Sequence, residues 1–204
     1  MIQHFGVNIR NKHDGLKLTR DNYIKVSNKS SLRKGKVYSD EYINKQRQNA
    51  LYNYDLNIEY FNSLSKRKFN KGIKKFIKKA KVFEEIDNLS SFENVPGYYV
   101  MVLDDYAQAY IGSSKDIKKR IQQHWTKQKE FDRLIWGKKE NSILSIDSFR
   151  AYDTTRIFVY VTEDHRSQEN NFIDLFKDKY LLNRTAGGLE GLMESNIFAK
   201  TRDL

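Results

Sequence analysis

The 204-residue sequence contains no cysteine and only one proline, Pro96. Without cysteine the chain has no disulfide framework, no thiolate zinc site and no cysteine nucleophile, so any metal must bind to oxygen or imidazole nitrogen. No apolar run approaches the ~18 residues that a membrane helix needs, and the mean hydropathy is −0.77. These absences predict a soluble protein without a membrane helix or a secretory signal, and they are compatible with a reducing cytoplasm.

Basic residues are in excess, and they are unevenly distributed. The chain holds 37 Lys and Arg against 26 Asp and Glu, a net charge of +11, which favours an anionic partner such as nucleic acid. Residues 1–92 contain 20 basic and 9 acidic residues, whereas residues 93–204 contain 17 of each. We therefore divide the chain into a basic, mainly helical DNA-docking region, 1–92, and a charge-balanced body, 93–204, that carries the chemistry.

Two helices are predicted in the basic region. Apolar residues at helical spacing follow Ser39, a good N-cap, and predict a helix over about 40–64. Over 66–81 a single apolar stripe lies among basic residues, which is typical of an amphipathic helix. We expect its basic side chains to contact DNA phosphates: Lys66, Arg67, Lys68, Lys71, Lys74, Lys75, Lys78 and Lys79. A solvated face over a small helical core is the alternative, and membrane binding fits poorly because the stripe lacks tryptophan. Residues 1–38 are polar and show no clear period.

The body is predicted to be α+β. Apolar runs predict strands over 98–103, 108–111 and 156–162, with a turn at 104–106. Ser113 and Asp116 have the capping-box spacing of a helix that continues to His124. Further helices are predicted over 127–136 and 167–180, and the segment 141–153 has no assignable pattern. Three of the ten glycines lie between 187 and 191.

Glu169 is the most informative single residue. Phe172, Ile173, Phe176 and Tyr180 follow it at +3, +4, +7 and +11, which places the carboxylate on the inward stripe of its helix. An unpaired carboxylate there is costly, which makes this position unusual. A first-turn acid stabilised by the helix dipole explains the same position equally well.

Two further pairs of residues stand out by their spacing. Arg120 and His124 are four apart on one predicted helix, and Tyr99 and Tyr110 lie on adjacent strands. Taken singly, each has an ordinary structural interpretation, such as a core tyrosine whose hydroxyl reaches the sheet margin.

Together these residues resemble the paired signature of the GIY-YIG nucleases. Gly97-Tyr98-Tyr99 is followed, eleven residues after Tyr99, by Tyr110 of the triplet Tyr110-Ile111-Gly112. Arg120, His124 in an R-x-x-x-H arrangement, Glu169 and Asn183 before Gly187-Gly188 then occur in the order of that family. The resemblance spans about residues 94–191 and does not cover residues 1–92. It implies a small antiparallel β-sheet flanked by helices, preceded here by the basic helical arm.

The resemblance also implies the chemistry of a DNA endonuclease. Glu169 would be the single protein ligand of Mg²⁺ or Mn²⁺, Arg120 would stabilise the scissile phosphate, and His124 would assist. Tyr99 is the expected general base, although a phenol with an ordinary pKa near 10 is a poor base. Tyr110 would bind the phosphate or orient the water, and the two tyrosine roles are interchangeable. Asn183 has a catalytic or a structural role near the metal carboxylate.

The sequence departs from the family pattern in three places. The first triplet has tyrosine where Ile or Val is usual, Gln108 and Ala109 stand where many members carry a lysine, and the basic region precedes the nuclease body instead of following it. A restriction-type, mobile-element or phage enzyme in a bacterial cytoplasm is expected. A nucleic-acid-binding protein without cleavage is the alternative, while homodimerisation, a protein partner, RNA as substrate and the kind of cut stay open.

Overall fold

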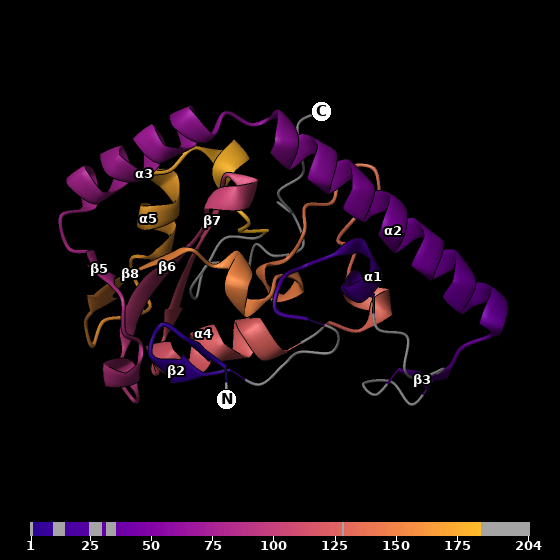
Figure 1. Ribbon diagram of the computed structural model, residues 1–204, viewed down its shortest axis with the longest axis horizontal. Helices are drawn as coiled ribbons and strands as arrows, with labels where there is room; N and C mark the ends of the chain where they lie inside the picture. Colours follow the sequence, from indigo (N-terminus) through magenta and orange to yellow (C-terminus); the bar gives the residue numbers. More distant parts are fainter. Residues whose placement is uncertain (1, 10–14, 25–29, 32–35, 128, 185–204) are drawn as a thin grey trace.

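A four-stranded antiparallel sheet forms the centre of the protein in this computed structural model, which describes residues 2–9, 15–24, 30–31, 36–127 and 129–184 (Figure 1). The strand order is β5-β8-β6-β7, so β7 is an edge strand. The strands are β5 (Glu84–Ile86), β6 (Gly97–Leu103), β7 (Gln108–Ser114) and β8 (Arg156–Val161). The predicted α+β class is confirmed.

The hairpin of β6 and β7 brings the two tyrosine-containing triplets together. Tyr99 lies opposite Gly112 and Met101 lies opposite Tyr110 in the antiparallel register. The connection is a 3-10 turn, η2 (Asp104–Tyr106), followed by Ala107 in the left-handed conformation. Because side chains alternate between the faces of a strand, this register places Tyr99 and Tyr110 on the same face of the sheet.

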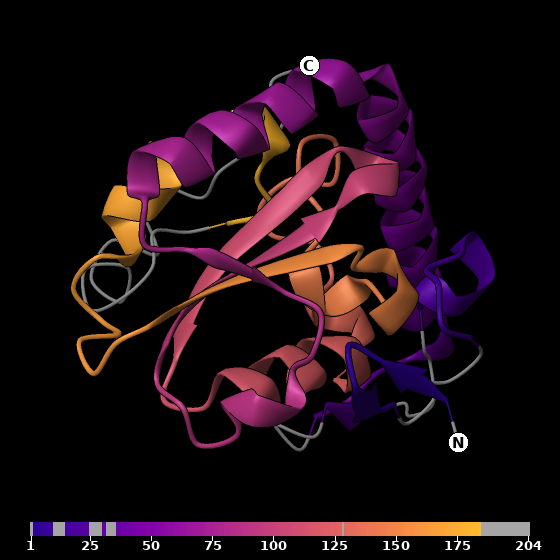
Figure 2. The same cartoon turned by 60° about the vertical axis from the view of Figure 1, so that its left-hand side comes forward.

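Helices cover both faces of the sheet (Figure 2). The basic helix α3 (Lys66–Ala80) and the short helix α5 (Glu169–Asp174) pack on the face that carries Tyr98 and Val100. Helix α4 (Ile117–Thr126) and the long helix α2 (Asp40–Ser63) contribute to the core on the opposite face. Both faces are therefore buried, and side chains can approach the edge of the sheet at β7 from either side.

The basic N-terminal region and the body share one sheet and its two cores. Strand β5, from the basic region, pairs with β8, and the apolar stripe of α3 packs against Phe172 and Phe176 of the body. The first residues form smaller elements: β1 (Gln3–His4), β2 (Val7–Asn8), α1 (Arg20–Tyr23), β3 (Ser30–Ser31) and β4 (Lys36–Val37). No structural boundary separates the described parts of 1–92 from the body, although their charges differ.

Helix α2 also holds a distant loop of the body. The side-chain amide of Asn53 donates to the carbonyl oxygens of Lys139 and Ser142, each at 2.7 Å. Asn57 donates to the Ser142 carbonyl at 2.9 Å and accepts from the amide of Leu144 at 3.1 Å. Both asparagines are fully buried, so these bonds satisfy polar groups that water cannot reach. They fix the course of the chain between residues 139 and 144.

The strongly periodic elements agree with the sequence predictions. The two N-terminal helices and the three strands occur as predicted, except that β7 continues to Ser114. The capping-box prediction is wrong in one respect: Asp116 caps α4 by accepting from the amide of Lys119, whereas the Ser113 hydroxyl turns to Glu169 instead. Capping-box spacing alone does not specify which partner a hydroxyl chooses.

Two helix predictions are wrong in length or kind. The described residues of the segment 127–136 form the 3-10 turn η3 (Phe131–Arg133) and no α-helix, and Phe131 and Leu134 are buried. The helix predicted over 167–180 ends at Asp174, and a further turn, η6 (Asp178–Tyr180), follows. The amide of Phe176 bonds the carbonyl of Ile173, an i to i−3 bond, so the last turn tightens while the apolar stripe stays buried. The unassigned segment 141–153 holds the turns η4 (Ile146–Ser148) and η5 (Ala151–Asp153).

The packing of α3 predicts that the basic helix and the body unfold together. Phe76 is buried, and its ring lies 5.4 Å from that of Phe83 and 5.8 Å from that of Phe176. Phe76→Ala is expected to lower the free energy of unfolding by about 3–5 kcal/mol, whereas the neighbouring exposed change Lys75→Ala has little effect. Urea denaturation followed by circular dichroism measures both. Two separate transitions, or an unchanged midpoint for Phe76→Ala, would contradict a shared core.

Candidate active site

Five of the six residues predicted as catalytic line one cavity of about 230 Å³. Arg120 and His124 come from α4, Glu169 from α5, Tyr110 from β7, and Asn183 from the segment after η6. The sixth residue, Tyr99, is fully buried, does not line the cavity, and contacts His124. The cavity therefore gathers side chains from four separate segments beside the edge strand β7.

The edge of β7 is closed by the chain that follows η6. The amide of Leu182 donates to the carbonyl of Ala109 at 2.8 Å. The side chain of Asn183 then bonds both backbone groups of Ile111, accepting from its N–H at 3.1 Å and donating to its C=O at 2.7 Å. Asn183 thus pairs backbone groups of an edge strand, which gives it a structural role. The predicted glycine loop at Gly187-Gly188 lies outside the described residues.

Tyr99, His124 and an aspartate, Asp147, form a chain of two hydrogen bonds. The Tyr99 hydroxyl lies 2.9 Å from Nε2 of His124, and Oδ1 of Asp147 lies 2.6 Å from its Nδ1. Asp147 is part of η4. Burial alone would raise the pKa of Asp147, but the hydrogen bond and charge of His124 hold it below its ordinary value. The carboxylate is therefore ionised and accepts the Nδ1–H, which leaves Nε2 as the acceptor of the tyrosine proton.

Arg120 lies near both tyrosines. Its positive charge acts on the hydroxyls of both Tyr99 and Tyr110. Burial raises the pKa of each phenol far above its ordinary value, and the positive charge of Arg120 only partly opposes this. Both tyrosines are therefore protonated at neutral pH, and neither is present as a free phenolate.

Glu169 is buried at the start of α5, as its position on the apolar stripe predicted. One of its oxygens accepts a hydrogen bond of 2.5 Å from the hydroxyl of Ser113 on β7. Burial raises the pKa of Glu169, while the Ser113 hydrogen bond and the charge of Arg120 act in the opposite direction. A carboxylate with this burial gains from a nearby cation.

The donor set fits a hard divalent cation bound by one carboxylate. Among the described residues no group of three His, Asp or Glu side chains could together hold a metal. Mg²⁺ commonly binds one or two carboxylates and keeps waters and phosphate oxygens as its other ligands. Glu169, which lines the cavity, could supply that single protein ligand.

Three residues of the site were missed by the sequence reasoning. Asp147 lies in the segment without a pattern, and Lys129 lies where a helix was wrongly predicted. Arg184 directly follows Asn183, and its buried guanidinium donates to the carbonyls of Ile143 and Leu134. Only Arg184 had a signal, namely its position beside a predicted site residue.

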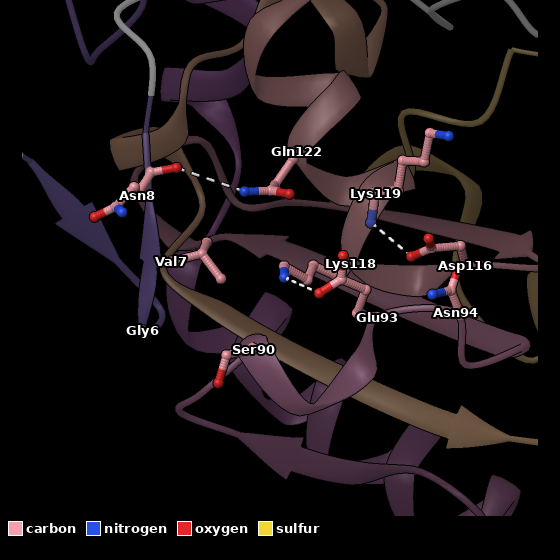
Figure 3. Close-up of a pocket in the computed structure, with 10 residues that line it drawn as sticks. All are labelled: Gly6, Val7, Asn8, Ser90, Glu93, Asn94, Asp116, Lys118, Lys119 and Gln122. Atoms are coloured by element: carbon pink, nitrogen blue, oxygen red, sulfur yellow. Dashed lines mark hydrogen bonds and ion pairs between the residues drawn. The ribbon is translucent and has the colours of Figure 1, made fainter.

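A separate cavity contains none of the residues predicted as catalytic. It measures about 560 Å³ and lies between the β1-β2 hairpin and α4 (Figure 3). Lys118 on its wall pairs with Glu93 at 2.7 Å, and the Asp116 carboxylate accepts from the backbone amide of Lys119. Volume therefore does not identify the site, whereas the convergence of ionisable side chains does.

Comparisons of the chain with protein-family models, curated proteins and solved structures gave no match.

Within the described part of the chain, no helix combines the length and apolar character needed to cross a bilayer.

Two glycine substitutions test the packing around Tyr99. A Cβ at Gly112 would lie 2.5 Å from the Tyr99 hydroxyl oxygen, whereas one at Gly72 in α3 would meet only Phe176, at 3.7 Å. Gly112→Ala is expected to destabilise the protein by about 1–3 kcal/mol through overpacking. Gly72→Ala is expected to stabilise it by about 0.5–1 kcal/mol through helix propensity. Thermal unfolding measures both, and equal effects of the same sign would contradict the close approach of Tyr99 to β7.

Proposed function

We propose that this protein is a divalent-metal-dependent endonuclease that hydrolyses DNA phosphodiester bonds in the manner of the GIY-YIG nucleases. The observation that carries the proposal is the convergence of Tyr110, Arg120, His124 and Glu169 in one cavity, with Tyr99 bonded to His124. Their order along the chain suggested the family, and their separation in sequence makes a chance meeting at one edge of the sheet improbable.

Arg120 and Tyr110 supply contacts for the reacting phosphate. Phosphodiester hydrolysis concentrates negative charge on the phosphoryl oxygens in the transition state. The guanidinium of Arg120 is permanently charged, and its planar donors match a pair of phosphate oxygens. Tyr110 lines the same cavity and adds a hydroxyl donor. We assign both residues to phosphate binding.

Tyr99 and His124 provide a route for the proton of the attacking water. The Tyr99 hydroxyl can accept that proton while it passes its own to Nε2 of His124, and Asp147 stabilises the imidazolium that results. This relay needs no free phenolate, which the raised pKa of Tyr99 disfavours. Because Tyr99 is fully buried, substrate binding must bring the water past Arg120 and Tyr110 to reach it.

Glu169 is the residue proposed to hold Mg²⁺ or Mn²⁺. When bound, the cation would supply positive charge at the phosphate and so favour attack by water. The Ser113 hydroxyl orients the carboxylate by its hydrogen bond.

The outer face of α3 is proposed as a DNA-docking surface. The eight predicted lysines and arginines of this helix are all exposed, because Phe69, Ile73 and Phe76 turn the opposite face into the core. A rigidly anchored row of cations can neutralise successive phosphates and release their counterions. None of the eight lines the cavity, so they serve affinity and not the reaction.

Substitution of Glu169 tests the proposed function. Glu169→Gln keeps the shape of the side chain but removes its charge, so Mg²⁺-dependent conversion of supercoiled plasmid to nicked or linear DNA is expected to fall by about 10³-fold or more. Glu163→Gln, at an exposed position outside the cavity, is the matched control and is expected to retain the activity.

Binding measurements separate the two functional alternatives. Both variants are expected to bind DNA as the wild-type protein does, since α3 is unchanged. Binding of DNA by the wild type without any Mg²⁺-dependent cleavage would favour the non-catalytic alternative. Cleavage by Glu169→Gln at the wild-type rate would overturn the assignment of the metal ligand.

Removal of one hydroxyl tests the proton relay. Tyr99→Phe preserves the ring and deletes only the atom that contacts His124, so the turnover rate is expected to fall by about 10²-fold or more with little change in DNA affinity. Tyr160→Phe removes a strand hydroxyl that lies outside the site and serves as the control. Retained turnover in Tyr99→Phe would make Tyr99 a core aromatic residue without a role in the reaction.

A further inference from the structure

A second cavity adjoins the candidate active site. It measures about 540 Å³ and is lined by Lys127, Glu130, Arg133, Ile135 and Trp136, together with two residues that also line the first cavity. Those two are Lys129 and Asp147, which therefore stand at the junction. We call this second cavity the flanking groove. A linear molecule bound in the active site can continue into it past Lys129.

The junction carries a buried donor without a partner. Two nitrogens of the Arg184 guanidinium donate to backbone carbonyls at 2.7 and 2.8 Å, but Nη1 has no hydrogen-bond partner among the described residues. The side chain is more than nine-tenths buried and lines the active-site cavity. A buried donor left unpaired costs about 1–3 kcal/mol, so a ligand acceptor at this point would be favourable.

Lys129 adds a second cation at the same point. Burial, together with the positive charge of Arg184, lowers its pKa to about 8. The acids nearby are engaged elsewhere, since Asp147 bonds His124 and Glu130 pairs with Arg133 at 3.7 Å. An anion between Lys129 and Arg184 would relieve the repulsion of these two cations. A phosphate would supply a negative charge between these two cations and an acceptor for Nη1 of Arg184.

Trp136 gives the flanking groove an aromatic surface. Trp136 is 41% exposed, and the hydroxyl of Ser142 accepts from its backbone amide at 2.9 Å, which fixes its place in the chain. An exposed indole beside Lys127 and Arg133 combines the two features that single-stranded nucleic-acid sites share, cations for the backbone and a flat ring on which a base can stack.

We propose that the flanking groove binds the nucleic-acid strand next to the phosphate that is cut, with the neighbouring phosphate between Lys129 and Arg184 and an unpaired base stacked on Trp136. The inference rests on the proposed nuclease function for the identity of the reacting phosphate. The binding itself needs neither metal nor cleavage, which allows it to be tested separately.

Tryptophan fluorescence measures this binding directly, because the sequence holds only two tryptophans. Trp125 is 2% exposed and its Nε1 donates to Thr154, so a bound base can reach only Trp136. In EDTA, an eight-residue oligothymidylate is expected to quench the fluorescence saturably. Trp136→Phe is expected to abolish the quenching.

Lys129→Gln tests the phosphate contact. This side chain is partly exposed and has no packing role comparable to that of Arg184, so the variant is expected to fold and to raise the Kd from quenching by about 10-fold or more. Lys138→Gln, an exposed lysine outside the groove, is the matched control with an unchanged Kd. Both variants are compared at one salt concentration, because phosphate contacts depend on salt.

The outcomes separate this inference from the proposed function. Absent quenching, or a Kd that Lys129→Gln leaves unchanged, would overturn the flanking groove as a strand site even if plasmid is cleaved. Quenching that responds to Lys129→Gln and Trp136→Phe supports the groove. If the same protein never cleaves DNA, the nuclease proposal fails and the strand site remains.

Discussion

The arrangement of the site depends on a buried imidazole. His124 is 1% exposed, so neither of its nitrogens can be satisfied by bulk water. Tyr99 on β6 and Asp147 on η4 are the partners that satisfy them. These two hydrogen bonds connect α4 to the sheet and to the loop that contains η4. Arg120, one turn earlier on α4, is thereby directed at both tyrosines. Loss of either partner would leave a buried polar atom unpaired, at a cost of about 1–3 kcal/mol.

The basic N-terminal region has a structural role as well as its proposed role in DNA docking. Asn53 and Asn57 of α2 hold the loop that leads to Asp147. Helix α3 packs in the same aromatic core as α5, the helix whose first residue is Glu169. The charge asymmetry of the sequence therefore separates two proposed tasks but does not mark two folding units. Under the proposed function, this region would couple DNA binding to the geometry of the reaction, because both would depend on the same core.

Local sequence patterns predicted the elements whose structure depends on residues close together in the sequence. The helices over 40–64 and 66–81 and the hairpin of Tyr99 and Tyr110 follow from apolar spacing, and Glu169 was found because a carboxylate on an apolar stripe is unusual. Asp147 could not be found in this way, because its segment forms only short 3-10 turns, which give no repeating apolar spacing, and its course is fixed by contacts with asparagines of α2 far away in the sequence. Ser113 shows the same limit: its spacing suggested a helix cap, and only the fold reveals that its hydroxyl binds Glu169. The family resemblance supplied the order of the candidate residues along the chain, and the cavity at the edge of β7 brings most of these residues together.

The central claim is that the edge of β7 binds a divalent cation at Glu169, within reach of Arg120 and the tyrosines. Paramagnetic broadening by Mn²⁺ in the amide NMR spectrum measures this most directly, because the effect is confined to nuclei near the ion. We predict that substoichiometric Mn²⁺ broadens the signals of Gly112, Ser113 and Asn170 first, and that Mg²⁺ reverses the effect. Broadening centred instead on the acids of the β6-β7 turn, Asp104 and Asp105, with the signals around Glu169 unchanged, would contradict the account.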